Sequence, residues 1–226
     1  MAWLVDFYRS PLAKKVVMAV TGIMLFGFVL GHMLGNAKMY LGEETFNHYA
    51  EGLRTVGGPF LAHGQALWIA RIGLLVAIVL HIWSAWQLTL LNRRARPSAY
   101  VKKDFVQATY ASRTMRWGGV IILLFVVYHL LHLTFGTVHP SFEAGNAYHN
   151  VVAGFQNPLV SGFYILANLA LAFHLYHGLW SMFQSLGWNH ASYKSARRIF
   201  ASVFSLLVTA GNISFPLAVL AGIVHL

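Results

Sequence analysis

Histidines lie in the middle of long apolar runs of this chain. The run Gly162–Gln184 places His174 and His177 halfway along a stretch that is long enough to cross a bilayer, which takes about 20 residues at 1.5 Å each. An ionisable side chain at that depth is costly and needs a partner. The small residue Gly178 beside them suits a flat, iron-bearing ligand. For one such histidine, a metal ligand and a hydrogen-bonded contact between helices are equally good interpretations.

Three more apolar runs carry histidines, whereas the fifth run has none at its centre. The central histidines are His32, His81, His129 with His132, and His174 with His177. His32 and His129 lie about 9–15 Å from the outer ends of their runs, and His81 and His174 about 26 Å. Two imidazoles at one depth on facing helices suit the axial positions of a six-coordinate haem, which carries electrons and does not bind oxygen. Depth therefore predicts an outer pair and an inner pair, holding two haems stacked across the membrane.

Five transmembrane helices are expected to position these histidines. Hydrophobic residues make up 58% of the chain and charged residues 10%, with a mean hydropathy of +0.59, far from the composition of a soluble protein. The fold prediction is an all-α membrane protein, one transmembrane domain over residues 1–226, whose first four helices form a haem-binding bundle. The predicted helices cover about residues 16–34, 67–91, 117–138, 159–186 and 199–224.

Two connections between these helices show a different pattern. Phe46, Tyr49, Ala50 and Leu53 recur at the spacing of one helix face, and so do Tyr148, Val151, Val152 and Phe155. Such segments predict short amphipathic helices that lie at the membrane surface.

The distribution of lysine and arginine predicts the orientation. The amino-terminal segment and the second and fourth connections carry thirteen of the sixteen basic residues. Because basic residues stay on the cytoplasmic side, the amino terminus is expected inside and, after five crossings, the carboxyl terminus outside. The expected location is the cytoplasmic membrane, which the chain crosses several times.

Composition also excludes some partners and cofactors. The chain has no cysteine, so it cannot hold a thiolate-bound iron–sulfur cluster. Its formal charge of +10 is spread over short connections without an aromatic-laced basic stripe, so no nucleic-acid partner is expected.

Two of the runs resemble helices of a known family. Residues 116–129, RWGGVIILLFVVYH, and residues 162–181, GFYILANLALAFHLYHGLWS, are similar to the third and fourth helices of the five-helix, dihaem cytochrome b subunit of succinate dehydrogenases and fumarate reductases. The similarity extends over essentially the whole chain. It implies that one histidine from each of the first four helices binds haem iron. The ligands would be His32 with His129 at the outer haem b and His81 with His174 at the inner one, the pairing that depth indicates.

The resemblance also implies a function. The chain would be the membrane anchor of a succinate:quinone oxidoreductase and pass electrons between flavin and iron–sulfur subunits and membrane quinone, of the menaquinone type. Without cysteine or a dinucleotide-binding glycine fingerprint, the chain is expected to leave flavin and iron–sulfur clusters to separate subunits. Those subunits are expected to dock on the cytoplasmic face and to carry the succinate-oxidising site, so no catalytic residue is assigned on this chain.

Four further residues are candidate contacts of a haem propionate or a quinone. His132 and His177 stand beside the ligands. Some relatives have an acidic residue, implicated in quinone chemistry near the outer haem, where this chain has Arg54, with Glu51 one turn earlier. The quinone site is therefore expected either outside, near Glu51 and Arg54, or inside, near the cytoplasmic ends of the first, second and fourth helices.

Other functions have weaker support from the sequence. A quinone-reactive cytochrome b of a hydrogenase or formate dehydrogenase is also dihaem and histidine-ligated, but the regular order of one central histidine per helix argues against it. A membrane di-iron hydroxylase or desaturase favours adjacent histidine pairs and added carboxylates, and the spans have neither. A transporter or scaffold with buried polar histidines is the third alternative.

Overall fold

Five long helices dominate the computed structural model, which describes residues 10–95 and 110–226. Each of the five is long and apolar enough to cross a membrane. They are α2 (Pro11–Asn36), α4 (Gln65–Arg94), α5 (Tyr110–His129), α7 (Pro158–Ser185) and α8 (Lys194–Leu220). No strand occurs in the described residues. The prediction of an all-α membrane protein with five transmembrane helices is confirmed.

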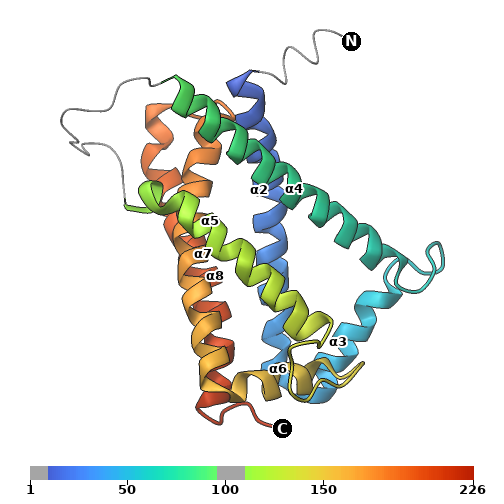
Figure 1. Cartoon of the computed structure of the whole chain (residues 1–226). Helices are drawn as coiled ribbons and strands as arrows, with labels where there is room; N and C mark the ends of the chain where they lie inside the picture. Colours follow the sequence, from blue (N-terminus) through green and yellow to red (C-terminus); the bar gives the residue numbers. More distant parts are fainter. Residues whose placement is uncertain (1–9, 96–109) are drawn as a thin grey trace.

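The two ends of the bundle differ in their structure. Figure 1 shows that α2, α5 and α8 begin, and α4 and α7 end, at the same end of the bundle. The opposite end carries the short helices α3 (Glu43–Thr55) and α6 (Ala147–Gln156) and the last residue, Leu226. The predicted amphipathic segments therefore form helices at the end that the charge pattern assigns to the outside.

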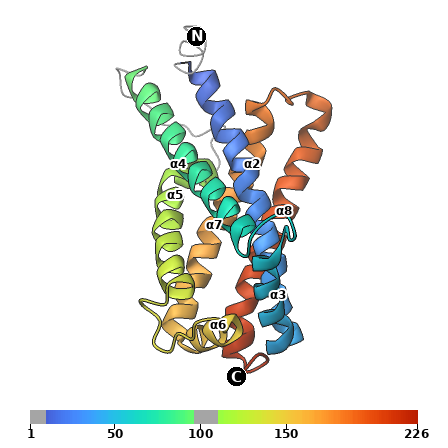
Figure 2. The ribbon, with the colours of Figure 1, turned by 90° about the vertical axis from the view of Figure 1, so that its right-hand side faces the viewer.

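The long helices pack in pairs. Helix α4 packs along α2, α5 along α7, and α8 along α7, while α2 joins the two halves through α7 and α8. Figures 1 and 2 show these helices in two views that differ by a quarter turn. The helices that share each predicted histidine pair, α2 with α5 and α4 with α7, are not among the closely packed pairs of the described chain. The histidine pairs thus lie between helices whose backbones are held apart.

Two of the long helices begin at side-chain caps. Ser10 accepts a hydrogen bond from the backbone N–H of Ala13, and Pro11 follows it at the first helical position. Asn157 accepts from the N–H groups at the start of α7, where Pro158 is again the first residue. Such caps satisfy helix N–H groups that have no partner within the helix. They fix the residues at which α2 and α7 begin.

The third and fifth spans end earlier than predicted. Helix α5 continues as one π-helical turn, Leu130–Thr134, and stops before Gly136, which has a φ of +72°. Helix α8 ends at Leu220, two residues before Gly222, which has a φ of +71°. Glycine adopts this left-handed conformation readily and commonly ends helices. These two spans thus end at Thr134 and Leu220, where the apolar pattern indicated ends at about residues 138 and 224.

Part of the hydrophobic core lies at the outer end. Met39, Phe46, Tyr148, Val152 and Phe155 are all buried there, and most of them come from α3 and α6. Many large apolar side chains on the long helices are exposed, as expected for surfaces that face lipid. The two short helices thus close the outer end of the bundle over the histidine-bearing helices.

Candidate functional site

The structure brings together the two histidines of each predicted pair. The ring centres of His32 on α2 and His129 on α5 are 5.8 Å apart, with ring planes at 89°. The ring centres of His81 on α4 and His174 on α7 are 6.3 Å apart, with planes at 56°. An imidazole nitrogen lies about 2 Å from a transition metal, so two rings on opposite sides of one metal have centres about 6 Å apart. Both pairs have the separation that such coordination needs.

The pairs lie at different depths of the bundle. The inner rings are close to Gly22 of α2 and Gly119 of α5, since a Cβ there would lie 3.5 Å from Cε1 of His81 and 3.8 Å from Cε1 of His174. On α2 and on α5, ten residues separate these glycines from the outer ligands His32 and His129, a rise of about 15 Å. The two pairs are therefore about 15 Å apart along the bundle.

Glycines leave room beside the outer pair. A Cβ atom at Gly27 or Gly31 of α2 would meet nothing within 4 Å. Gly35 differs, because it packs directly against the ring of Tyr49 on α3. Gly27, Gly31 and Gly35 recur at four-residue spacing on α2, and the first two thus border open space next to His32. This space suits the close approach of a flat ligand, whereas Gly35 serves contact between helices.

A hydrogen bond fixes the orientation of His81. Oγ1 of Thr21 lies 3.1 Å from Nδ1 of His81 and donates its own proton to the carbonyl of Val17, 2.7 Å away. Because the hydroxyl proton is used, Thr21 accepts from His81 and Nδ1 carries the imidazole proton. Nε2 of His81 is then the nitrogen with a free lone pair. Histidines that bind metals commonly use their other nitrogen in this way.

The ring of His174 has no such partner. Its Nδ1 atom is buried and makes no hydrogen bond with any described residue. Leaving a buried polar atom unpaired costs about 1–3 kcal/mol. The donor set of the inner pair therefore suits a bound group, because one nitrogen of His81 is fixed as an acceptor and one of His174 lacks a protein partner.

Tyr164 of α7 connects the outer pair with the second histidine of α5. Its hydroxyl lies 3.3 Å from Nδ1 of His129 and 3.0 Å from Nδ1 of His132. Tyr164 and His132 are both buried. Tyr164 thus links His132 to His129, which is a predicted haem ligand. His177 is partly buried on α7, three residues beyond His174.

Glu51 and Arg54 lie on α3 at the outer end and form an ion pair of 2.7 Å with each other. Glu51 also lies 2.9 Å from Nε2 of His63. Hydrogen bonds from His63, and then from Arg54, lower the pKa of the Glu51 carboxyl. Both members of the ion pair are exposed, and their side-chain partners are each other and His63 rather than the four predicted haem ligands.

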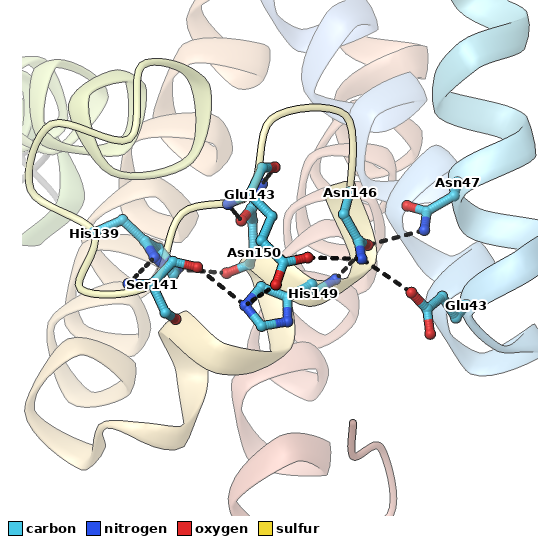
Figure 3. Close-up of polar contacts among 8 residues, drawn as sticks. All are labelled: Glu43, Asn47, His139, Ser141, Glu143, Asn146, His149 and Asn150. Carbon is cyan, nitrogen blue, oxygen red and sulfur yellow. Dashed lines mark hydrogen bonds and ion pairs between the residues drawn. The ribbon is translucent and has the colours of Figure 1, made fainter.

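The outer rim beside this ion pair is built from polar side chains (Figure 3). Asn146 donates to Glu43 of α3 and receives a hydrogen bond from Asn47. Nε2–H of His139 donates to the carbonyl of Asn150, and its Nδ1 accepts from the N–H of Ser141. The segment that follows α5 is therefore tied to both α3 and α6.

Sequence reasoning missed Thr21 and Tyr164. Thr21 lies 60 positions from His81, and Tyr164 lies 35 positions from His129. Neither spacing follows from the period of one helix. A weak signal exists for Tyr164, because it stands ten residues before His174 on α7 and so at the depth of the outer pair.

The described residues contain no group of three or more histidine or acidic side chains that could hold a metal ion. A di-iron centre would need such a cluster of histidines and carboxylates.

Comparison with known proteins identifies the family. The family model described as succinate dehydrogenase/fumarate reductase transmembrane subunit matches residues 89–211, more than half of the chain and the part that contains His129 and His174. Searches of curated proteins and of solved structures found no match. The chain belongs to the family of transmembrane subunits of succinate dehydrogenase and fumarate reductase.

Proposed function

We propose that the chain is the dihaem cytochrome b anchor of a succinate:quinone oxidoreductase and passes electrons between flavin and iron–sulfur subunits and membrane quinone, of the menaquinone type. The observation that carries this proposal is the presence of two histidine pairs, with ring centres 5.8 and 6.3 Å apart, in a chain of this family. His32 and His129 would hold the outer haem b, and His81 and His174 the inner one.

Haem, when held by these histidine pairs, would supply one-electron transfer. The chain would orient the imidazole rings of the ligands. Thr21 holds the proton of His81 at Nδ1, and the Tyr164 hydroxyl lies within hydrogen-bond distance of Nδ1 of His129. In each pair, one ligand thus has a polar partner on a neighbouring helix, which keeps Nε2 directed away from that partner.

The spacing of the two histidine pairs along the helices supports electron transfer across the membrane. The pairs are about 15 Å apart along the helices, and the hydrocarbon core is about 30 Å thick. Both pairs therefore fit within one bilayer, with the inner pair on the side where α2 begins.

The cytoplasmic face is the proposed contact for the flavoprotein and iron–sulfur subunits. Described basic residues gather at that end of the bundle: Lys14, Lys15, Arg93, Arg94, Arg116, Lys194, Arg197 and Arg198. The rest of the second connection lies outside the described residues. The same charge distribution supports an amino terminus inside and a carboxyl terminus outside in the cytoplasmic membrane.

The quinone site near Glu51 and Arg54 stays a proposal, with the cytoplasmic ends of the helices as the alternative. Quinone chemistry moves protons together with electrons, so its site needs a proton-exchanging group. Glu51 is exposed and already bound by Arg54 and His63. If Glu51→Gln and Arg54→Gln both leave quinone turnover of the whole complex unchanged, the outer site at these residues is wrong.

A reduced-minus-oxidised optical spectrum of the purified chain tests the proposed function. We expect the α-band of haem b and co-purification of a flavoprotein and an iron–sulfur protein. A spectrum without that band would overturn the cytochrome function. A haem b band with a hydrogenase or formate dehydrogenase as the co-purifying partner would instead support the other class of cytochrome b.

A further inference from the structure

A cavity at the outer end lies between α3 and the short 3₁₀ helix Ala37–Leu41 that follows α2. Its volume is about 400 Å³, which falls in the range of small-molecule sites. The residues that line it include Lys38 and, at the spacing of one face of α3, Thr45, His48, Tyr49, Gly52 and Leu53. None of the four predicted haem ligands lines it, and neither does the ion pair on the other side of α3.

Lys38 supplies a positive charge at this cavity. Its ammonium group lies over the ring of Tyr49, 5.3 Å from the ring centre, and that ring packs against Gly35 of α2. No described carboxylate forms an ion pair with Lys38, whereas Arg54, the other basic residue between α2 and α4, is bound by Glu51. The end of α2 favours a cation, but it carries only about half a negative charge. Lys38 can therefore still bind an anion.

Apolar side chains next to the cavity are open to the surroundings. Leu34, one turn before Lys38, is 57% exposed, and Leu41 is 68% exposed. Leu53 and Val56 continue this apolar surface on the α3 side. The membrane-crossing segment that contains α2 extends to Leu41, so the cavity lies at the edge of the span, at the level of lipid headgroups. A small soluble anion would leave these leucines uncovered, whereas a phospholipid joins a phosphate to acyl chains.

We propose that this cavity binds the headgroup of an anionic phospholipid. Its phosphate lies at the ammonium group of Lys38, with the hydroxyl of Thr45 and the imidazole of His48 as polar neighbours, and its acyl chains cover Leu34 and Leu41. Because α3 and the end of α2 both line the cavity, the bound lipid holds them together at the membrane surface. This inference does not depend on haem.

The first test labels the purified complex with a photoreactive phosphatidylglycerol that carries a diazirine in its acyl chain. The complex is held in nanodiscs of phosphatidylcholine, and peptide mass spectrometry measures labelling of residues 34–56. For Lys38→Gln we expect roughly fivefold less labelling than in the wild type, the contribution of one lysine near an anionic lipid. Lys38→Arg keeps the charge and should keep most of the labelling.

Two controls separate this site from general attraction of lipid to basic residues. Arg54→Gln removes one charge from the other side of α3, where Arg54 is bound by Glu51, and should be labelled like the wild type. A phosphatidylcholine probe, whose headgroup has no net charge, should label residues 34–56 of the wild type several-fold less. Inorganic phosphate in excess should not compete, because it has no acyl chains, and competition would indicate a simple anion site instead.

A second variant tests the cavity without changing any charge. A Cβ atom at Gly52 would meet nothing within 4 Å, so the side chain of Gly52→Leu has room to extend into the cavity and displace the headgroup. We expect labelling as low as in Lys38→Gln. If Gly52→Leu is labelled like the wild type, the lipid does not occupy the cavity.

Equal labelling of the wild type and Lys38→Gln, or an equal loss in Arg54→Gln, would overturn the inference. Should Lys38→Gln not fold, Gly52→Leu and the phosphatidylcholine probe decide in the same way. A wild-type chain without haem would contradict the proposed function but not this inference, because labelling at residues 34–56 would remain.

Discussion

Replacing Gly154 with alanine tests how tightly the outer end is packed. A Cβ atom at residue 154 would lie 2.7 Å from Cε1 of His132 and 3.1 Å from Nε2 of both His132 and His139. Neither ring can move aside easily. His132 is stacked between Tyr128 and His139, and His139 is hydrogen-bonded to the backbone at both nitrogens.

Two opposing effects set the change in the free energy of unfolding that Gly154→Ala causes. Overpacking an interior costs about 1–3 kcal/mol, whereas alanine is about 1 kcal/mol better than glycine within a helix. Because the added methyl group would press on two fixed rings, we expect the upper part of the first range and a net loss of about 1–2 kcal/mol. For a chain of this length, that loss lowers the Tm by roughly 2–8 °C.

Thermal unfolding of the detergent-solubilised protein, followed by circular dichroism, measures this change. Gly52→Ala on α3 is the matched control, because a Cβ there would meet nothing within 4 Å. The control should have the wild-type Tm or a higher one. If Gly154→Ala is as stable as Gly52→Ala, the packing around His132 has been misjudged.

Three further changes test other parts of the structure. Thr21→Val keeps the shape but removes the acceptor of His81 Nδ1–H, so haem titration of the apoprotein should show roughly 10–100-fold weaker binding at the inner site alone; equal affinity would contradict this role. The pKa of Glu51 is lowered on folding, chiefly by the hydrogen bond from His63, so its ionised form stabilises the fold above the ordinary Glu pKa and this contribution is lost as the pH falls through the lowered value. The Tm difference between wild type and Glu51→Gln should therefore shrink as the pH drops below 4.5, and a constant difference would refute the assignment. A reporter fused after Leu226 should be active only outside the cytoplasm, and activity inside would mean an even number of crossings.

Apolar runs and histidine depth predicted much of the fold and the proximity of the pairs. A membrane span has a fixed length, so an apolar run shows both the helix and its place in the bilayer. Residues at similar depths on facing helices then become neighbours, as His81 and His174 are. The amphipathic pattern of α3 and α6 was equally informative, because one face of each helix had to be buried.

Contacts between different helices could not be predicted in the same way. The pairing of Tyr164 with His132 depends on how α7 is rotated against α5, and on the π-helical turn that shifts the residues after His129. The early end of that span depends on the backbone of Gly136, whose left-handed conformation the apolar pattern does not show. Nothing in the sequence indicated that His63, in the connection before α4, would lie against Glu51 of α3.

The haem content of paired histidine variants tests the central proposal most directly. We expect two haems per wild-type chain and one after His32→Ala, His129→Ala or both together, because the two residues would hold the same haem. Combining His32→Ala with His81→Ala should leave none. A chain that loses both haems in the His32/His129 double variant, or keeps one in the His32/His81 double variant, would contradict the pairing.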